Sequence, residues 1–177
     1  TEDGRWLLKA MAAVGFTLDI SHMDELSARQ ALDYYPGAVI ASHANAAALI
    51  PSYSGNRHLS DAILRALVER GGIIGLIPTC SFLDYGWKRG DPRTITMEMV
   101  AAQVDHICQL AGSADHVGLG SDFDGGFGVD VATAEVDSIA DLQKLGPHLT
   151  AKGYNDEQVA AIFGGNWIRH LQAHLPS

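Results

Sequence analysis

The chain has 177 residues, of which 47% are hydrophobic and 19% charged, a composition typical of a globular domain with a sizeable core. The formal net charge of −9 argues against nucleic acid as a partner, because proteins that bind nucleic acid usually carry basic patches. The longest apolar stretch, around residues 71–78, is too short to span a bilayer, so we expect no membrane segment in this chain.

Helix-like and strand-like patterns alternate along the chain. In chain order, apolar spacing and breaker residues predict a helix over 5–14, a strand over 16–21, a helix over 24–34, a strand over 38–42, a helix over 61–70, a strand over 73–77, a helix over 94–111, a strand over 116–120, and helices over 138–152 and 156–174. Short, nearly all-apolar strands between helices indicate parallel β/α units buried on both faces.

Four such units fit two architectures. One is an open doubly wound sheet, and the other is half of an eight-stranded β/α barrel. The first strand–helix turn lacks the glycine-rich phosphate-binding fingerprint, which argues against a nucleotide-binding sheet. Because no repeat, low-complexity tract or flexible linker divides the chain, residues 1–177 are interpreted as a single domain.

Three side chains with metal-binding chemistry follow predicted strands. His22 follows the first strand, His43 the second and Asp122 the fourth. The carboxyl ends of parallel strands in a barrel meet at one mouth, and imidazole and carboxylate are good zinc ligands. A histidine at one strand end is more often structural, but two at equivalent ends plus an acid make a shared metal site an equal alternative, and the residues by themselves leave the choice open. Asp124, beside a Gly–Gly turn, is predicted to hydrogen-bond the loop backbone instead.

Arg57 lies in the loop that follows His43. A guanidinium at an active-site mouth can bind a substrate carboxylate through two parallel hydrogen bonds. The alternative is a surface arginine near the start of the next helix, and the local sequence by itself favours that alternative.

The remaining histidines and both cysteines are assigned no chemistry. The histidines lie within helices or at a strand start and are interpreted as solvated or packing side chains: His106, His116, His148, His170 and His174. Cys80 and Cys108 lie in different elements without CxxC spacing, so we predict two reduced, mostly buried thiols and no zinc–thiolate site.

Five short segments follow one another between residues 18 and 126: LDISH at 18–22, ASHAN at 41–45, NRHLSD at 56–61, ERGGIIGL at 69–76 and GLGSDFDGG at 118–126. Together they resemble the membrane (renal) dipeptidase family of the amidohydrolase superfamily, whose members are β/α barrels with a dinuclear zinc centre. The resemblance implies an α/β fold that forms the C-terminal half of a (β/α)8 TIM-type barrel with parallel strands.

By this resemblance, His22 and His43 bind one zinc ion, and Asp122 binds the other and manages the proton of the attacking water. Arg57 holds the free carboxylate of the substrate. The implied activity is a zinc-dependent dipeptidase that hydrolyses dipeptides, including those with C-terminal D-residues, by a hydroxide bound to two zinc ions. The family often has Asn after this arginine, whereas the present chain has His58.

The family's remaining ligands, a His-x-Asp pair and a bridging Glu, would precede residue 1, as would four of the eight strands. We therefore expect association with the N-terminal half of the barrel or with further copies of the chain, because a half-barrel exposes two sheet edges and an apolar face.

Two alternatives to a dipeptidase stay open. One is another amidohydrolase-type hydrolase of amides or lactams, and the other is an inactive half-barrel fragment that needs its N-terminal half. No hydrophobic anchor tail follows Trp167, and bacterial members of the family are often cytoplasmic, so the resemblance favours the cytoplasm.

Overall fold

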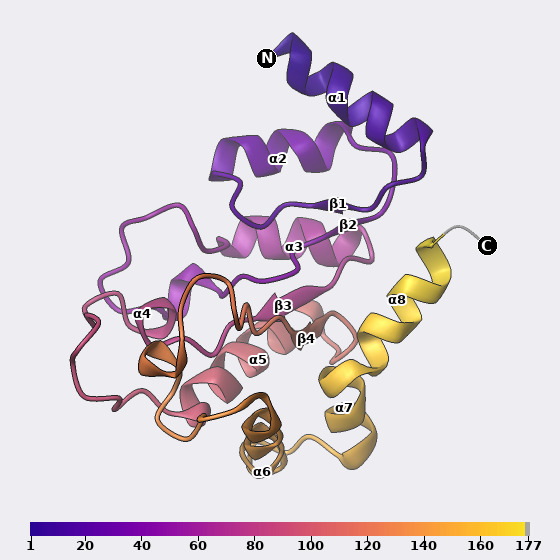
Figure 1. Ribbon diagram of the computed structural model, residues 1–177. Coiled ribbons are helices and arrows are strands. Elements are labelled where there is room, and N and C mark those ends of the chain that lie inside the picture. Colours follow the sequence, from indigo (N-terminus) through magenta and orange to yellow (C-terminus); the bar gives the residue numbers. More distant parts are fainter. Residues whose placement is uncertain (176–177) are drawn as a thin grey trace.

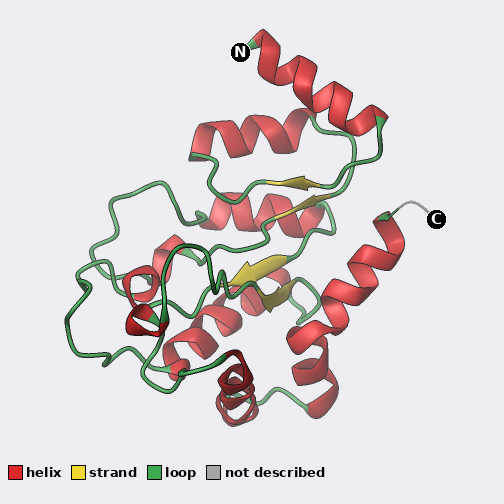
Figure 2. Cartoon of the chain, in the orientation of Figure 1, coloured by secondary structure: helices red, strands yellow, loops and turns green. Residues whose placement is uncertain are grey.

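The computed structural model describes residues 1–175, in which four short strands alternate with helices (Figures 1 and 2). The strands are β1 Leu18–Asp19, β2 Val39–Ile40, β3 Ile74–Leu76 and β4 Val117–Leu119. The α-helices are α1 Glu2–Ala13, α2 Glu25–Tyr34, α3 Asp61–Glu69, α4 Cys80–Leu83, α5 Met97–Ala111, α6 Leu145–Ala151, α7 Asp156–Ala160 and α8 Asn166–His174. Three 3-10 turns lie at Ala47–Leu49, Val129–Val131 and Ile139–Lys144, and a π-helical segment lies at Ala161–Gly165.

All strand pairs are parallel. β1 pairs with β2 and β3 pairs with β4, and a bridge between Ala41 and Ile74 joins the two pairs in the order β1-β2-β3-β4. Within residues 1–175 the sheet is open and does not close into a barrel. The prediction of successive parallel β/α units is therefore confirmed.

The helices that connect the strands form one layer. α2 packs against α3, and α3 packs against α5, so the three crossover helices cover the same face of the sheet. Their apolar residues and those of the strands form the core; the largest fully buried side chains include Tyr35, Ile63, Leu64, Leu67, Ile74, Leu76 and Ile107. A doubly wound sheet would place helices on both faces, so the single layer favours the barrel arrangement.

The strands are shorter than predicted, and the first is buried on one face only. In β1, Leu18 and the following Ile20 are buried beneath the helices, whereas Asp19 points to the opposite, exposed face. The expectation that every strand would be covered on both faces is wrong for β1, because the described chain has no second layer over that face.

Three predicted helices also differ from the structure. α1 forms, with Thr1 as its N-cap, but it buries none of its residues, and Trp6 and Leu7 of its apolar stripe are exposed. The helix predicted over 138–152 begins as a 3-10 turn before α6. The helix predicted over 156–174 is interrupted because Gly164 has non-helical dihedral angles.

The two outer strands of the sheet have different edges. The carbonyl oxygen of Val117 accepts a hydrogen bond from Asn166 Nδ2 at 2.8 Å, and that of Leu119 accepts one from Trp167 Nε1 at 3.0 Å. The Trp167 indole lies directly against Gly118, where any Cβ would clash with the ring. Helix α8 therefore covers the β4 edge, whereas no element of the described chain pairs with the β1 edge.

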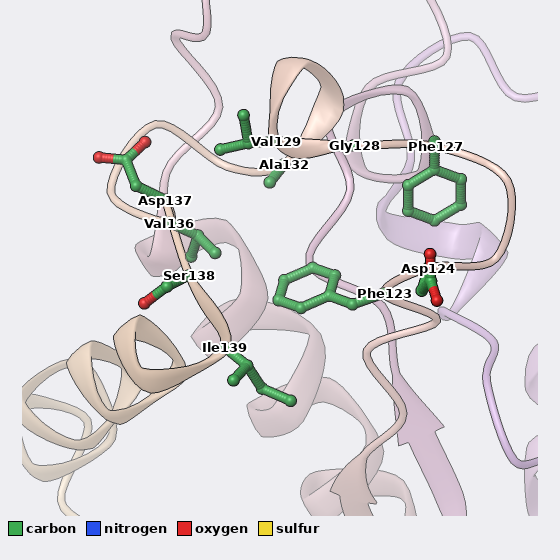
Figure 3. A pocket seen from close by; sticks show the side chains of 10 residues that line it. All are labelled: Phe123, Asp124, Phe127, Gly128, Val129, Ala132, Val136, Asp137, Ser138 and Ile139. Carbon is green, nitrogen blue, oxygen red and sulfur yellow. The ribbon is translucent and has the colours of Figure 1, made fainter.

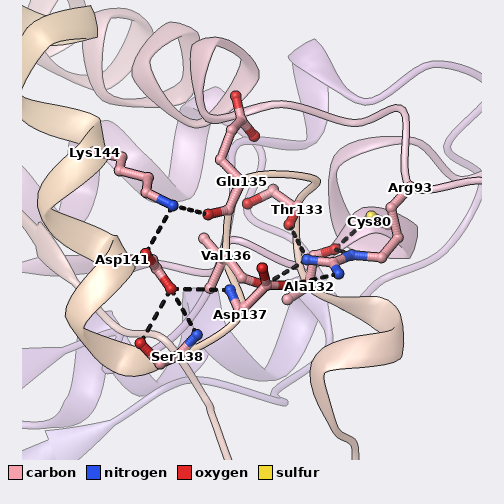
Figure 4. A network of polar contacts seen from close by, with 10 residues as sticks. All are labelled: Cys80, Arg93, Ala132, Thr133, Glu135, Val136, Asp137, Ser138, Asp141 and Lys144. Atoms are coloured by element: carbon pink, nitrogen blue, oxygen red, sulfur yellow. Dashed lines mark hydrogen bonds and ion pairs between the residues drawn. The ribbon is translucent and has the colours of Figure 1, made fainter.

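A long loop connects β4 to the C-terminal helices, and Arg93 holds it in place (Figure 4). The guanidinium donates to the carbonyl oxygens of Ala132 at 3.1 Å and Thr133 at 2.7 Å, and it forms an ion pair with Asp137 at 3.0 Å. Lys144 donates to the carbonyl oxygen of Glu135 at 2.7 Å. These contacts hold residues 132–137, the second part of the loop, in place.

Candidate active site

His22 and His43 meet at the carboxyl ends of β1 and β2. Their Nε2 atoms lie 2.8 Å apart, with the ring centroids 4.9 Å apart and the rings in an edge-to-face arrangement. The backbone of His22 has a left-handed conformation with φ of 69°, which is uncommon for a residue other than glycine. Two imidazole nitrogens at adjacent strand ends have the chemistry of zinc ligands.

A hydrogen-bond network behind the histidines orients His43. Asp19 Oδ1 accepts from the backbone N–H groups of Ser21 at 2.9 Å and Ser42 at 3.0 Å, and Asp19 Oδ2 accepts from the Ser42 hydroxyl. Ser42 Oγ also lies 2.7 Å from His43 Nδ1. Burial raises the pKa of Asp19, but the hydrogen bonds from Ser42 and Ser21 outweigh it, so the pKa lies below the usual value.

Two glycines hold the backbone of Ser42 close to the neighbouring strands. A Cβ at Gly75 of β3 or at Gly120, just after β4, would clash with the Ser42 carbonyl oxygen. Only glycine permits this approach, which locates the Ser42 hydroxyl next to Asp19 and His43.

Arg57 is held over the same end of the sheet with part of its guanidinium unpaired. Its Nη2 donates to the carbonyl oxygen of His43 at 3.0 Å, and the guanidinium carbon lies 5.4 Å from the centre of the Phe82 ring. Its Nε and Nη1 atoms are buried and have no partner among the described residues. Burial lowers the pKa of Arg57, while the charge of Asp122 opposes this effect. A buried cation with free donors is suited to binding an anion.

His58, next to Arg57, has a structural role. The ring Nδ1 of His58 accepts a hydrogen bond from the backbone N–H of Asn45 at 3.2 Å. The backbone N–H of His58 donates to the Tyr53 hydroxyl at 2.7 Å. Burial, and secondarily the charge of Arg57, lower the pKa of His58 to about 3, so the side chain is neutral. The difference from the family's usual Asn therefore leaves a hydrogen-bond acceptor at this position.

Asp122 lies at the end of β4 in a left-handed backbone conformation with φ of 53°. Its charge acts on both His43 and Arg57: it raises the pKa of each against the larger lowering caused by burial. Within residues 1–175, however, no group of three or more histidine, cysteine or acidic side chains lies close enough to hold a metal ion. The described chain thus contains the predicted ligands without a complete site.

Asp124 differs from expectation. Its φ is 71°, and in the described part of the chain its carboxylate forms no hydrogen bond with the loop backbone, so that prediction is wrong. Asp124 instead borders an open pocket of about 200 Å³ (Figure 3). The pocket is lined mainly by apolar side chains, among them Phe123, Phe127, Val129, Val136 and Ile139. Its volume is below the 300–1,000 Å³ typical of sites that hold a whole ligand.

Two of the histidines to which no chemistry was assigned have polar contacts, and a third is buried. His106 Nε2 lies 2.8 Å from Asp61 Oδ1, His116 Nδ1 lies 2.9 Å from the carbonyl oxygen of Gly72, and His170 is buried. Cys80 and Cys108 are free and buried, as predicted.

The sequence interpretation assigned no role to Asp19, Ser21 or Ser42, although all three lie within the motifs that it used. The signal was present, because Asp19 is a carboxylate between two apolar residues of a strand, and alternation places it on the same face as Ser21.

A family model described as Membrane dipeptidase (Peptidase family M19) matches residues 1–174. The chain belongs to the membrane dipeptidase family. This confirms the resemblance that the sequence motifs indicated. No helix within residues 1–175 has the length and apolar character needed to cross a membrane.

Curated relatives of this M19 chain are considerably longer. Dipeptidase tcpJ of Claviceps purpurea is 35% identical over 173 residues, which are 96% of this chain and 37% of that protein. Dipeptidase ataJ of Aspergillus terreus is 33% identical, over 93% of this chain and 38% of its own length. An uncharacterized protein in the pqqA 5' region of Klebsiella pneumoniae is 32% identical, over 97% of this chain and 60% of that protein. The chain spans less than two thirds of each.

Solved M19 structures have the same fold over a matching region. Dipeptidase AC, a metallopeptidase of this family, superposes with a TM-score of 0.86 at 29% identity, over 100% of this chain and 49% of that one. A metallopeptidase from Rhodobacter sphaeroides, liganded with a phosphinate mimic of the dipeptide L-Ala-D-Ala, gives 0.85 at 29% identity, over 98% of this chain and 47% of that one.

Proposed function

We propose that this chain supplies the C-terminal half of a (β/α)8 barrel in which a two-zinc site hydrolyses dipeptides. The observation that carries the proposal is the convergence of the His22 and His43 Nε2 atoms, 2.8 Å apart, at the ends of adjacent parallel strands. The proposal is supported by membership of the M19 family and by a match that covers about half the length of each of the two solved relatives.

His22 and His43 would bind one zinc ion, and Asp122 would bind the other. Zinc, when bound, polarises a carbonyl group and lowers the pKa of a water molecule from about 15.7 to about 7. Asp122, whose charge already acts on His43 and Arg57, would accept the proton of the attacking water and donate it to the leaving amine. The His-x-Asp pair and the bridging Glu of the family would come from the other half of the barrel.

Arg57 would bind the substrate carboxylate. Its Nε and Nη1 atoms are buried without partners, and a carboxylate at this position would satisfy them through charge-assisted hydrogen bonds. A carboxylate held this close to the scissile bond favours dipeptides over longer peptides. A C-terminal D-residue would be accepted, in keeping with the L-Ala-D-Ala mimic bound to the Rhodobacter sphaeroides relative.

The N-terminal half of the barrel is the partner that we propose. The β1 edge has no partner strand in the described chain, and the large apolar side chains of Trp6, Leu7 and Phe16 are exposed. Association with an N-terminal half would pair this edge and cover these side chains. Further copies of the chain are the alternative occupant.

The test compares the 177-residue chain alone with the same chain joined or co-expressed with an N-terminal half, such as that of the Rhodobacter sphaeroides relative. Zinc content, particle size and hydrolysis are measured with L-Ala-D-Ala, L-Ala-L-Ala, a tripeptide, an N-acyl amino acid and a lactam. We expect zinc binding and dipeptide hydrolysis only in the complete assembly, together with a change from self-associated chains to a defined complex.

Two outcomes would contradict the proposal. One is an assembly that binds zinc but cleaves the lactam or N-acyl amino acid faster than any dipeptide, which would support another amidohydrolase reaction. The other is a compact, stable monomer of the isolated chain that shows no affinity for an N-terminal half.

A further inference from the structure

In the Asp19–Ser42–His43 network, the donor and the acceptor of each hydrogen bond are fixed. Asp19 Oδ2 and His43 Nδ1 both contact the Ser42 hydroxyl, which has a single proton to donate. An ionised carboxylate only accepts hydrogen bonds, so Ser42 must donate to Asp19. The Ser42 oxygen can then only accept from His43 Nδ1–H.

The position of that proton determines the state of the other ring nitrogen. A neutral imidazole carries one N–H, so protonation at Nδ1 leaves the lone pair of His43 Nε2 free. This is the nitrogen that lies 2.8 Å from His22 Nε2, so in the metal-free chain His22 must supply the proton of that contact. The low pKa of Asp19 agrees with an ionised carboxylate, which is the first acceptor in this series of hydrogen bonds.

We infer that Asp19 is a positioning residue that acts through Ser42 to keep His43 in the tautomer whose Nε2 can bind a metal ion. The inference rests on the proposed zinc-binding role of His43, and it assigns a function to a carboxylate that contacts neither the metal position nor the substrate. Hydrogen-bond partners of metal-binding histidines orient the ring and select its tautomer in the same way.

The substitution Asp19→Asn should reverse the tautomer. Asp19 Oδ1 accepts from two backbone N–H groups, those of Ser21 and Ser42, so an asparagine must place its oxygen there. Its NH2 group then faces Ser42 Oγ and donates to it. The Ser42 proton turns toward His43 Nδ1, and His43 becomes protonated at Nε2 with its lone pair blocked.

The experiment has two readouts. Long-range 15N–1H NMR of the metal-free chain, above the ordinary histidine pKa of about 6.5, reports which nitrogen of each imidazole is protonated. Competition with a chromogenic chelator, carried out on the complete assembly with the N-terminal half, gives the Kd for Zn²⁺. We expect His43 Nδ1–H and His22 Nε2–H in the wild type, His43 Nε2–H in Asp19→Asn, and a Kd for Zn²⁺ raised about 10- to 100-fold.

Asp24→Asn is the matched control. Asp24 Oδ1 also accepts a serine backbone N–H, from Ser27 at 3.0 Å, and its Oδ2 accepts the Ser27 hydroxyl at 3.3 Å, but it contacts neither His22 nor His43. Asparagine is an equally good helix N-cap, so this change should alter neither the tautomers nor the zinc affinity. If Asp19→Asn does not fold, Ser42→Ala tests the same contact, and we expect it to remove the preference for Nδ1–H.

The outcomes separate this inference from the proposed function. A wild-type His43 protonated at Nε2, or an unchanged tautomer in the folded variant, overturns the role of Asp19. An unchanged zinc Kd despite a reversed tautomer overturns its role in metal binding while zinc binding itself stands. A third outcome is that the tautomers are as expected but even the complete assembly binds no Zn²⁺. This outcome contradicts the proposed function and leaves the inferred direction of the hydrogen bonds intact.

Discussion

The two sides of the candidate site are built differently. On the histidine side, His43 is oriented by Ser42 and Asp19, and each contact has its partner within the chain. On the arginine side, Arg57 is half-buried, and two buried nitrogen atoms of its side chain are unpaired among the described residues. Under the proposed function, the histidine side is preorganised by the fold and the arginine side awaits a ligand, because an unsatisfied buried donor costs free energy until an anion binds.

The largest expected effect comes from breaking the histidine side. In the complete assembly, His22→Ala removes one of the two converging imidazoles, and we expect kcat/KM for L-Ala-D-Ala to fall at least about a thousandfold, equal to about 4 kcal/mol. His174→Ala, at an exposed position of α8, is the control and should have no effect. Full zinc-dependent turnover by His22→Ala would refute the metal assignment.

Arg57→Met should separate activity from stability on the arginine side. Loss of the charge-assisted hydrogen bonds should lower kcat/KM about 100-fold, equal to about 2.7 kcal/mol. The free energy of unfolding should stay constant or rise, because the substitution removes two unpaired buried donors. Urea denaturation and steady-state kinetics measure the two effects.

Arg65→Met, which changes an exposed arginine of α3, is the control and should leave both quantities unchanged. A large loss of stability in Arg57→Met without loss of activity would show that the guanidinium serves the fold and not the substrate.

Gly75→Ala tests the close approach between the backbones of Gly75 and Ser42, next to His43. The new methyl group would clash with the Ser42 carbonyl oxygen, so we expect the free energy of unfolding to fall by about 2 kcal/mol, together with weaker zinc binding. Gly4→Ala, in exposed α1, is the control and should be neutral or slightly stabilising because alanine favours helix. Equal denaturation midpoints for wild type and Gly75→Ala would rule out this packing.

The smallest expected effect is a pH dependence that originates at His58. Its pKa is about 3 in the folded chain and 6.5 in the unfolded chain, so between these values the unfolded state binds more protons. The free energy of unfolding should therefore fall by about 1 kcal/mol between about pH 7 and about pH 5.5.

His58→Asn keeps an acceptor for the Asn45 N–H but does not titrate in this range, so this part of the pH dependence should vanish. The same slope in both proteins would assign the effect to other groups.

The sequence predicted the family and the alternation of parallel strands and helices, and it singled out His22, His43, Asp122 and Arg57 as candidate site residues. It did so because short apolar strands, strand-end positions and the five motifs are all local patterns. The prediction failed for a continuous helix over 156–174, where Gly164 takes a non-helical conformation.

Tertiary structure alone decided how the site is held together. Asp19 and Ser42 are 23 positions apart in the sequence, and only the β1–β2 register brings the carboxylate to the serine hydroxyl. The unpaired state of the Arg57 donors and the contact of Ser42 with Gly75 likewise depend on three-dimensional packing. A motif determines which chemical groups are available, whereas hydrogen-bond partners and burial arise from segments that are distant in sequence and meet only in the folded chain.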